Sequence, residues 1–382
     1  ILVSADQLIP HGEDSPLKID NFQFSNGGLR LLIYTNSKRV WRKKTRGDYW
    51  VLDTTTSELK QLGGDVKPAS MMFAPYASAN NLYVQNLRNL EVIQLTQDGC
   101  SNIINGSFDW VYEEEFRLRK GFLWSPDGNS IAYWQLNTEG VREFNLINNT
   151  DSLYPKLKPI KYPKAGDQNS ACHLGVVGSG GGVTKWLQVQ GDPRNHYLAG
   201  MDWIEHPQEV IFQQLNRLQN SVKVMLGNPM TGESKKIHAD SDDAWLDVRS
   251  ELEWMGKNER LLWLSEKDGW RRINLVARSG EKVTEITPTG FDVVDIKGVD
   301  DQNDYIYFMA SPDDPKRRYL YRIKEDGSGM ARVTPGNVSG MNSYDISPDC
   351  SLAVHTFSTF DTPPVISLIK LPSHEVVKVL RD

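Results

Sequence analysis

The sequence predicts an all-β protein, a β-propeller built from four-stranded blades, on three observations. The first is a recurring hairpin pattern of an apolar or aromatic strand, a short polar turn and a second strand, clearest at residues 49–62, 224–237 and 273–287. The second is a Ser-Pro-Asp-Gly-like turn that leads into an alternating strand, as at residues 124–134. The third is the spacing of these units, roughly fifty residues, which is typical of propeller blades.

The turns of the hairpin pattern carry Gly, Asn and Asp, which supply the positive φ angles that tight hairpins require. Residues 319–327 give a fourth copy of the pattern, and residues 83–95 and 366–380 give looser copies. Together the two patterns predict a single domain, residues 1–382, with blades that begin near residues 18, 67, 118, 198, 248, 292 and 340. Residues 1–10 remain and are predicted to form one further strand.

The composition excludes several classes of function. The formal net charge is −6, which disfavours a nucleic-acid or anionic-membrane surface. No apolar run approaches the ~18–20 residues of a membrane span, and the N-terminus lacks the basic region of a signal peptide. The three cysteines are widely spaced, and the seven histidines have no metal-binding spacing. We therefore expect no metal site and no cofactor.

The most distinctive stretch is residues 109–115, Asp-Trp-Val-Tyr-Glu-Glu-Glu. Three consecutive carboxylates repel one another unless a cation or solvent compensates them. A solvated acidic turn is one interpretation of such a run. The run is followed by the strand-turn pattern at residues 124–128, however, so the acids are expected in an insertion, residues 105–117, between repeating β units.

This stretch resembles the acidic motif of dipeptidyl peptidase IV and its relatives. In that family the motif holds the free N-terminus of a peptide substrate, so the resemblance assigns Glu114 and Glu115 to the substrate ammonium. Tyr112 and Glu113 are then supporting residues, with Glu113 facing outward. Two carboxylates on one ammonium make charge-assisted hydrogen bonds worth roughly 1.5–3 kcal/mol each when sheltered.

A second motif, Trp41-Arg42, lies on a hairpin earlier in the chain. By itself it is consistent with a solvated basic loop. It also resembles the family's Trp-Arg pair, whose arginine contacts a substrate carbonyl and braces the acids. The planar guanidinium suits this role, because it can serve a carbonyl and a carboxylate at once.

A third motif occupies residues 150–166, where Ser-Leu-Tyr-Pro-Lys is followed by Tyr-Pro-Lys-Ala-Gly. The closely spaced prolines disfavour a central strand, and a long surface loop is one interpretation. The stretch is also similar to the family's extended arm, which reaches across a dimer interface. The resemblance therefore implies a possible homodimer, with Tyr154, Pro155, Tyr162 and Pro163 in the arm.

The sequence contains no Gly-x-Ser-x-Gly nucleophile elbow. The glycine cluster at residues 178–182 is predicted to be a hairpin loop, since it lacks the ending of a phosphate-binding loop. In the family, an α/β-hydrolase domain follows an eight-bladed propeller in the same polypeptide. We therefore expect no catalytic residue in this chain, which would be inactive alone and would lack three strands of the first blade.

The leading hypothesis is the substrate-gating propeller of a dipeptidyl-peptidase-IV-like serine exopeptidase that releases N-terminal dipeptides, in a periplasmic or secreted location. A free-standing propeller that binds other proteins is the alternative. A third option, the propeller of an acylaminoacyl-peptidase-like relative, would not need an acid pair for a free ammonium. Glu114 and Glu115 argue against that option.

Overall fold

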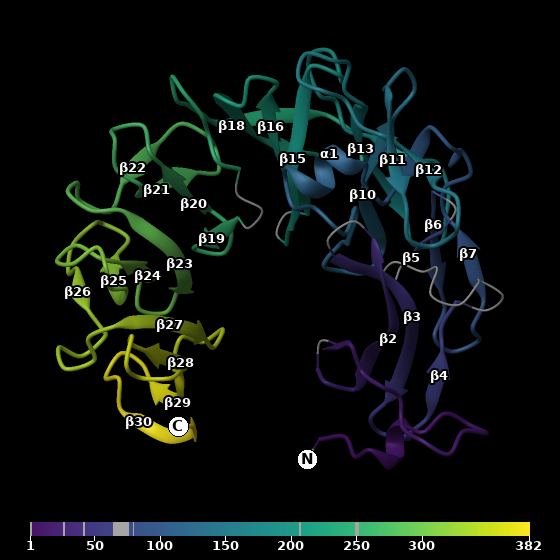
Figure 1. Cartoon of the computed structure of the whole chain (residues 1–382). Helices are drawn as coiled ribbons and strands as arrows, with labels where there is room; N and C mark the ends of the chain where they lie inside the picture. The colour runs from purple at the N-terminus through teal and green to yellow at the C-terminus, as the bar shows by residue number, and fades with distance from the viewer. Residues whose placement is uncertain are drawn as a thin grey trace. The chain divides into compact units, whose positions relative to one another are not determined.

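The computed structural model describes residues 2–25, 27–40, 43–63, 76–78, 80–205, 208–248 and 252–382. Their regular structure is almost entirely antiparallel sheet (Figure 1). The chain divides into two compact units. The first comprises Ile1–Trp203, Gln208–Val210 and Gly227–Ser234, and the second comprises Ile204–Pro207, Ile211–Leu226 and Lys235–Asp382. Among the described residues, no helix has the length and apolar character that a membrane span requires.

The first unit holds three sheets and a separate hairpin. One sheet has the order β1 (Asn21–Phe24), β2 (Arg30–Val40), β3 (Lys43–Asp53), β4 (Leu59–Gln61). The next has the order β5 (Tyr76–Ser78), β6 (Asn81–Gln85), β7 (Val92–Gln94). The third has the order β14 (Lys185–Trp186), β13 (Ala171–Gly178), β10 (Ser130–Asn137), β8 (Ile103–Asn105), with β9 (Phe122–Trp124) also on β10. The hairpin pairs β11 (Glu143–Asn148) with β12 (Lys156–Lys161).

Four-stranded sheets in simple sequence order make up the rest of the chain. The first, in which the boundary between the units falls, is β15 (His196–Ile204), β16 (Glu209–Asn216), β17 (Ser221–Gly227), β18 (Ser234–Ser241). The next is β19 (Glu253–Met255), β20 (Arg260–Ser265), β21 (Arg272–Ala277), β22 (Val283–Glu285). It is followed by β23 (Val293–Asp300), β24 (Tyr305–Ala310), β25 (Tyr319–Lys324), β26 (Ala331–Arg332). The last is β27 (Met341–Ile346), β28 (Leu352–Ser358), β29 (Val365–Lys370), β30 (Val376–Arg381). The predicted β-propeller of four-stranded blades is confirmed.

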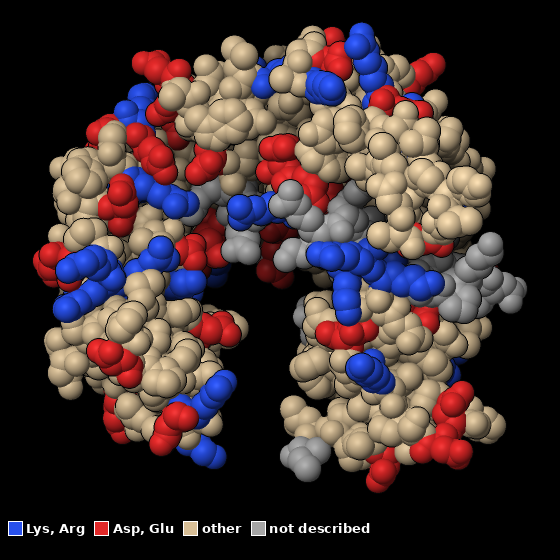
Figure 2. Space-filling view, in the orientation of Figure 1, with Lys and Arg blue, Asp and Glu red and all other residues tan. Residues whose placement is uncertain are grey.

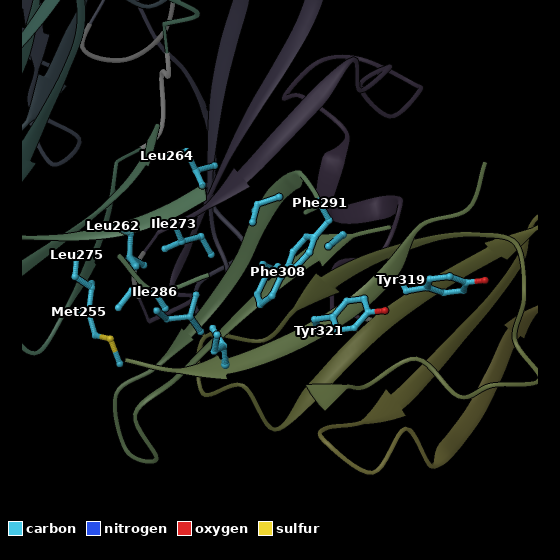
Figure 3. Packing of buried hydrophobic residues seen from close by; sticks show 14 residues of the cluster. Met255, Leu262, Leu264, Ile273, Leu275, Ile286, Phe291, Phe308, Tyr319 and Tyr321 are labelled. Atoms are coloured by element: carbon cyan, nitrogen blue, oxygen red, sulfur yellow. The ribbon is translucent and has the colours of Figure 1, made fainter. Parts of the chain in front are cut away.

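The two sheets β19–β22 and β23–β26 of the second unit are buried on both faces, which explains why their inner strands are almost wholly apolar. Figure 3 shows Phe308 of β24 in a cluster with residues of β19 to β21. Its neighbours Tyr307 and Met309 point to the opposite face and pack against β27 to β29. Successive side chains of a strand alternate between faces, so one continuous apolar run fills two interfaces. Burying a side chain such as Phe308 stabilises the fold by roughly 1.5–3 kcal/mol.

The same alternation occurs in the first unit. Tyr49 and Val51 of β3 face a cluster that includes Tyr83 of β6. Leu52 points the other way and packs with Leu8, from the 3-10 helix η1 (Asp6–Leu8). The expected strand at residues 1–10 is therefore wrong for the described residues 2–10, because a short helical turn covers this face of the sheet.

The Ser-Pro-Asp-Gly turns form as their residue types dictate. The Ser125 hydroxyl donates to Asp127 Oδ1 at 2.6 Å, and Gly128 has a positive φ of 72°. The turn after β27 repeats this arrangement, with Ser347 donating to Asp349 at 2.6 Å. The positive φ at its fourth position is taken by Cys350. These local hydrogen bonds explain why the turns could be predicted from residue type.

Most predicted blade starts lie close to observed sheets. The starts near residues 18, 198, 248, 292 and 340 correspond to sheets that begin at Asn21, His196, Glu253, Val293 and Met341. The start near residue 118 is wrong, because that sheet already begins at Ile103. The start near residue 67 lies outside the described residues, and β5 to β7 follow it. The glycine cluster at 178–182 joins the antiparallel strands β13 and β14, so the predicted hairpin loop is confirmed.

Candidate functional site

The acidic run lies in an excursion, a segment of the chain that leaves the sheet and re-enters it at the same position of strand β10. β8 pairs with Gln135 to Asn137 of β10, and β9 pairs with Ile131 to Tyr133 on the same strand. Between them, Gly106 N donates to Trp134 O and Trp134 N donates to Gly121 O, both at 2.9 Å. Residues 106–121 therefore leave the sheet and return to it around one residue of β10. The insertion lies inside one sheet, which corrects the expectation that it separates two β units.

A short helix, α1 (Trp110–Glu114), forms within this excursion. Asp109 is its N-cap, and Asp109 Oδ1 accepts a hydrogen bond from Tyr112 N at 3.0 Å. The other carboxylate oxygen, Oδ2, accepts from the Ser170 hydroxyl at 2.5 Å. Burial raises the pKa of Asp109, although both hydrogen bonds oppose this shift. The cap thus fixes the start of the helix and ties it to the residue that precedes β13.

Tyr112 anchors the helix in the first unit. Its side chain is 2% exposed and packs among the rings of Phe108, Phe116 and Tyr197. The Tyr112 hydroxyl accepts a hydrogen bond from Leu198 N at 3.2 Å. Because burial strongly disfavours the phenolate, the pKa of Tyr112 lies well above its ordinary value. The predicted supporting residue is therefore a neutral, buried anchor beneath the acids.

Glu113 is buried, with 4% of its surface exposed, so the expectation that it faces outward is wrong. Arg119 lies against it, with Nε 3.6 Å from Glu113 Oε1, and Arg119 Nη1 donates to the Glu113 carbonyl oxygen. Burial raises the pKa of Glu113 to about 7, while the charges of Arg119 and Arg46 lower it and that of Glu114 raises it. Burial is the largest of these effects, so Glu113 titrates near neutral pH.

Glu114 and Glu115 become progressively more exposed along the run. Glu114 is half-buried, and Glu115 is exposed at the C-cap, where its N–H donates to Val111 O at 2.9 Å. Glu115 also lines a cavity of about 570 Å³ whose other walls are largely aromatic and aliphatic. In Figure 2, acidic side chains gather around α1. The excursion thus presents Glu115 to solvent, while Glu114 is partly buried and Glu113 is almost wholly buried.

The predicted arm residues lie in two different places. Tyr162 packs on Trp110 of the helix, with ring centroids 4.1 Å apart, and lines the cavity beside Glu115 together with Pro163. Tyr154 and Pro155 are exposed at the far end of the β11–β12 hairpin, where Tyr154 is 79% exposed. Residues 150–166 are thus partly strand, since β12 pairs with β11 in register across Pro159. A two-stranded hairpin tolerates this proline because Pro is excluded only from central strands.

Trp41 and Arg42 lie outside the described residues, so their predicted contacts with substrate stay predictions. The described part of the chain contains no group of three or more His, Cys, Asp or Glu side chains that could hold a metal.

Two residues of the site were missed in the sequence. Ser170 binds the N-cap aspartate across 61 positions of sequence, so no local pattern could indicate it. Arg119 follows the acidic run closely, and a cation six positions after the first of three consecutive acids is a signal that could have been used.

Comparison with known proteins gives a consistent result. The family described as the dipeptidyl peptidase IV N-terminal region matches residues 25–364. Dipeptidyl peptidase 4 of Trichophyton rubrum is 26% identical over 351 residues, which cover 86% of this chain and 45% of that protein. Dipeptidyl aminopeptidase B of Saccharomyces cerevisiae is 25% identical over 371 residues, which cover 91% of this chain and 44% of that protein.

A solved structure shows the same similarity. The crystal structure of Porphyromonas gingivalis dipeptidyl peptidase 4 matches with a TM-score of 0.88 and 26% identity, covering 96% of this chain and 52% of that one. The chain spans about half the length of the relatives it matches.

Proposed function

The chain belongs to the family of dipeptidyl peptidase IV N-terminal regions, and from this premise we propose that it recognises the free N-terminus of peptide substrates for a serine-type dipeptidyl peptidase. Glu114 and Glu115 bind the substrate ammonium in this proposal. A fixed pair of anions holds the substrate amine one dipeptide length from the catalytic nucleophile, so cleavage falls after the second residue. A peptide with a blocked amine loses these contacts and therefore binds less tightly.

The observation that carries this proposal is the way α1 is held. The Asp109 cap, the buried Tyr112 ring and the Arg119–Glu113 pair fix the backbone on which the two acids stand. Pre-positioned carboxylates pay little ordering entropy when a ligand binds, which favours a specific contact over a diffuse acidic field. The cavity beside Glu115 adds an aromatic wall, formed in part by Trp110 and Tyr162, for an apolar side chain near the amine.

The catalytic groups belong, in this proposal, to an α/β-hydrolase domain elsewhere in the same polypeptide. This chain covers only about half the length of the relatives that it matches, which supports this division. The exposed end of the β11–β12 hairpin, with Tyr154 and Pro155, is proposed as an arm that contacts a second copy of the protein. A substrate carbonyl contact from Arg42 completes the proposal.

Calorimetric titration of this chain with matched peptides tests the assignment. The first peptide is a tripeptide amide with a free amine, and the second is its N-acetylated counterpart. We expect the free amine to bind at least about ten-fold more tightly, since one decade corresponds to about 1.4 kcal/mol. Glu114→Gln and Glu115→Gln should each remove most of this preference.

The control is Glu139→Gln, which removes the same charge from an exposed position in the same unit. It should leave the preference unchanged. Equal binding of the two peptides to the unmodified chain, or an equal loss in all three variants, would contradict a specific ammonium site.

A further inference from the structure

The cavity of about 570 Å³ beside Glu115 is lined by an acid and a base that do not pair with each other. Glu115 lies at the C-cap of α1, and Lys164 lies in the segment that follows β12. Both side chains are exposed, and neither makes an ion pair or a hydrogen bond within the described part of the chain. Two opposite charges that stay apart in one cavity can contact two charged groups of a single ligand.

The apolar walls of this cavity come from the β11–β12 hairpin and from α1, which lie side by side (Figure 1). Phe144 and Leu146 of β11 are two positions apart, so they point to the same side of the hairpin, where Ile160 is the cross-strand partner of Phe144. The Tyr162 ring lies 4.1 Å from the Trp110 ring and 5.6 Å from the Phe144 ring, so the three rings form one wall. Phe144 is 42% exposed and Leu146 is 39% exposed, so an apolar group of a ligand can cover them.

Both charged residues are close in the chain to the paired Trp110 and Tyr162 rings. Glu115 follows Trp110 by five residues, which is about 7.5 Å along a helix axis. Lys164 follows Tyr162 by two residues, which is at most about 7 Å of extended chain. Cavities of roughly 300–1,000 Å³ with apolar walls and a few charged groups are typical sites for small organic ligands. The fitting ligand is thus a small molecule that joins an ammonium, a carboxylate and a large apolar group.

We propose that this cavity binds zwitterionic dipeptides that carry an aromatic or large aliphatic side chain. The ammonium contacts Glu115, the carboxylate contacts Lys164, and the side chain packs on the wall that includes Phe144. The role of Glu115 rests on the proposed function, whereas the carboxylate and side-chain contacts rest on the cavity alone. Free dipeptides are the products that a dipeptidyl peptidase releases. A dipeptide bound in this way occupies Glu115 and competes with the N-terminus of the next substrate.

Calorimetric titration of this chain with Phe-Ala and Phe-Ala amide tests the carboxylate contact, because the two ligands differ in one negative charge. At low salt we expect Phe-Ala to bind about three-fold more tightly than its amide. Lys164→Gln should abolish this difference. Lys156→Gln is the matched control, since it removes the same charge from an exposed position of β12 that does not line the cavity.

Replacing Phe by Gly in the ligand tests the apolar wall. Gly-Ala should bind about ten-fold more weakly than Phe-Ala, because it leaves the wall exposed to water. Phe144→Ala should reduce this difference, whereas Ile147→Ala should not. Ile147 is an exposed apolar residue of the same strand, three positions further on and hence on the opposite face of the hairpin.

Equal affinity for Phe-Ala and its amide, or no measurable binding of either, would overturn the proposal. So would an equal effect of Lys156→Gln and Lys164→Gln, because the attraction would then be a diffuse field. Failure of the N-terminus proposal is separately visible, because acetyl-Phe-Ala and acetyl-Phe-Ala amide lack an ammonium and should still differ through Lys164. Where the free-amine preference of the tripeptide amide holds, Phe-Ala should displace that peptide, and failure to do so would exclude competition at Glu115.

Discussion

The backbones of Gly106 and Gly121 lie against each other where the chain leaves and re-enters the sheet, and together they close the excursion that carries the acids. Both glycines bond to the backbone of Trp134. A Cβ atom at position 121 would meet the Gly106 carbonyl carbon at 2.5 Å, which is far closer than any real contact of this kind. The geometry of the acid pair thus depends on two residues that carry no functional group.

Gly121→Ala should destabilise the protein by about 2 kcal/mol or more, because the obstructing atoms belong to the backbone and cannot rotate away. Chemical denaturation measures the change. Gly180→Ala is the control, since a Cβ there meets nothing within 4 Å. A Gly121→Ala variant as stable as the Gly180→Ala variant would mean that the excursion is not closed in this way.

Arg119 should stabilise the run chiefly above neutral pH. At pH 8 Glu113 is largely ionised, and Arg119→Met would leave a buried carboxylate without its cation, at a cost of about 2–3 kcal/mol. At pH 5 Glu113 is protonated, so the loss should be about 1 kcal/mol, from the carbonyl hydrogen bonds. Denaturant unfolding at both pH values measures this. Arg117→Met, an exposed arginine two positions earlier, should be nearly neutral at both.

Glu113 itself should make the folded state less stable as the pH rises. Its pKa is about 7 in the folded chain, against an ordinary value of 4.5, so between these values the folded state binds the proton and the unfolded state does not. Stability therefore falls as the pH rises from about 4.5 to 7, by up to about 3 kcal/mol. Glu113→Gln resembles the protonated form and should lack this loss.

The measurement is the difference in unfolding free energy between Glu113→Gln and the unmodified chain as a function of pH. It should grow in favour of the variant from pH 4.5 to 7 and stay constant above. A difference that does not vary with pH would show that Glu113 has an ordinary pKa, and hence that it is not buried.

The features that the sequence predicted depend on residues close together in the chain, whereas the features that it missed depend on residues far apart in the chain. Turns such as Ser125 to Gly128 and strands such as β21 depend on residues adjacent in the chain, so they were predictable. The orientation of Glu113 depends on Arg119 and on the fold around α1. Three identical neighbouring residues give no local signal of which one is buried. The hydrogen bond from Ser170 to Asp109 and the closure at Trp134 join distant segments, and one sequence does not reveal such pairs.

In the second unit, two buried histidines should make the protein sensitive to acid. His355 Nε2 lies 2.8 Å from Asn342 Oδ1, and His374 Nε2 lies 2.9 Å from the Tyr344 hydroxyl, which also bonds to Thr334 Oγ1. The ring centroids of the two histidines are 4.9 Å apart. Burial lowers the pKa of His355 to about 4, with a further contribution from His374, and burial also lowers the pKa of His374.

A histidine whose folded pKa is depressed is neutral in the folded state while the unfolded chain already binds a proton. Stability should therefore fall as the pH drops from about 6.5 to 4, by up to about 3 kcal/mol for His355. His355→Gln keeps a donor for Asn342 and should show a smaller acid-dependent loss in denaturant unfolding. His11→Gln, at an exposed position, should leave the loss unchanged. An identical pH dependence in both variants would rule out His355 as its source.

The last prediction concerns the pH dependence of peptide binding at Glu114 and Glu115. A peptide α-amino group has an ordinary pKa of roughly 7.7–8, and only its charged form satisfies both carboxylates. Binding should raise the pKa of that amine, so affinity is fully present below the free amine's pKa and is lost as the pH rises through the bound value. The alkaline limb is the part of a plot of Kd against pH in which Kd rises at high pH. For two peptides whose amine pKa values differ by about one unit, these limbs should be displaced by about one pH unit. Glu113→Gln should leave the limbs in place, because that side chain lies below the binding surface. Limbs that coincide for the two peptides would mean that a group of the protein titrates instead, and the acid run would then not be an ammonium site.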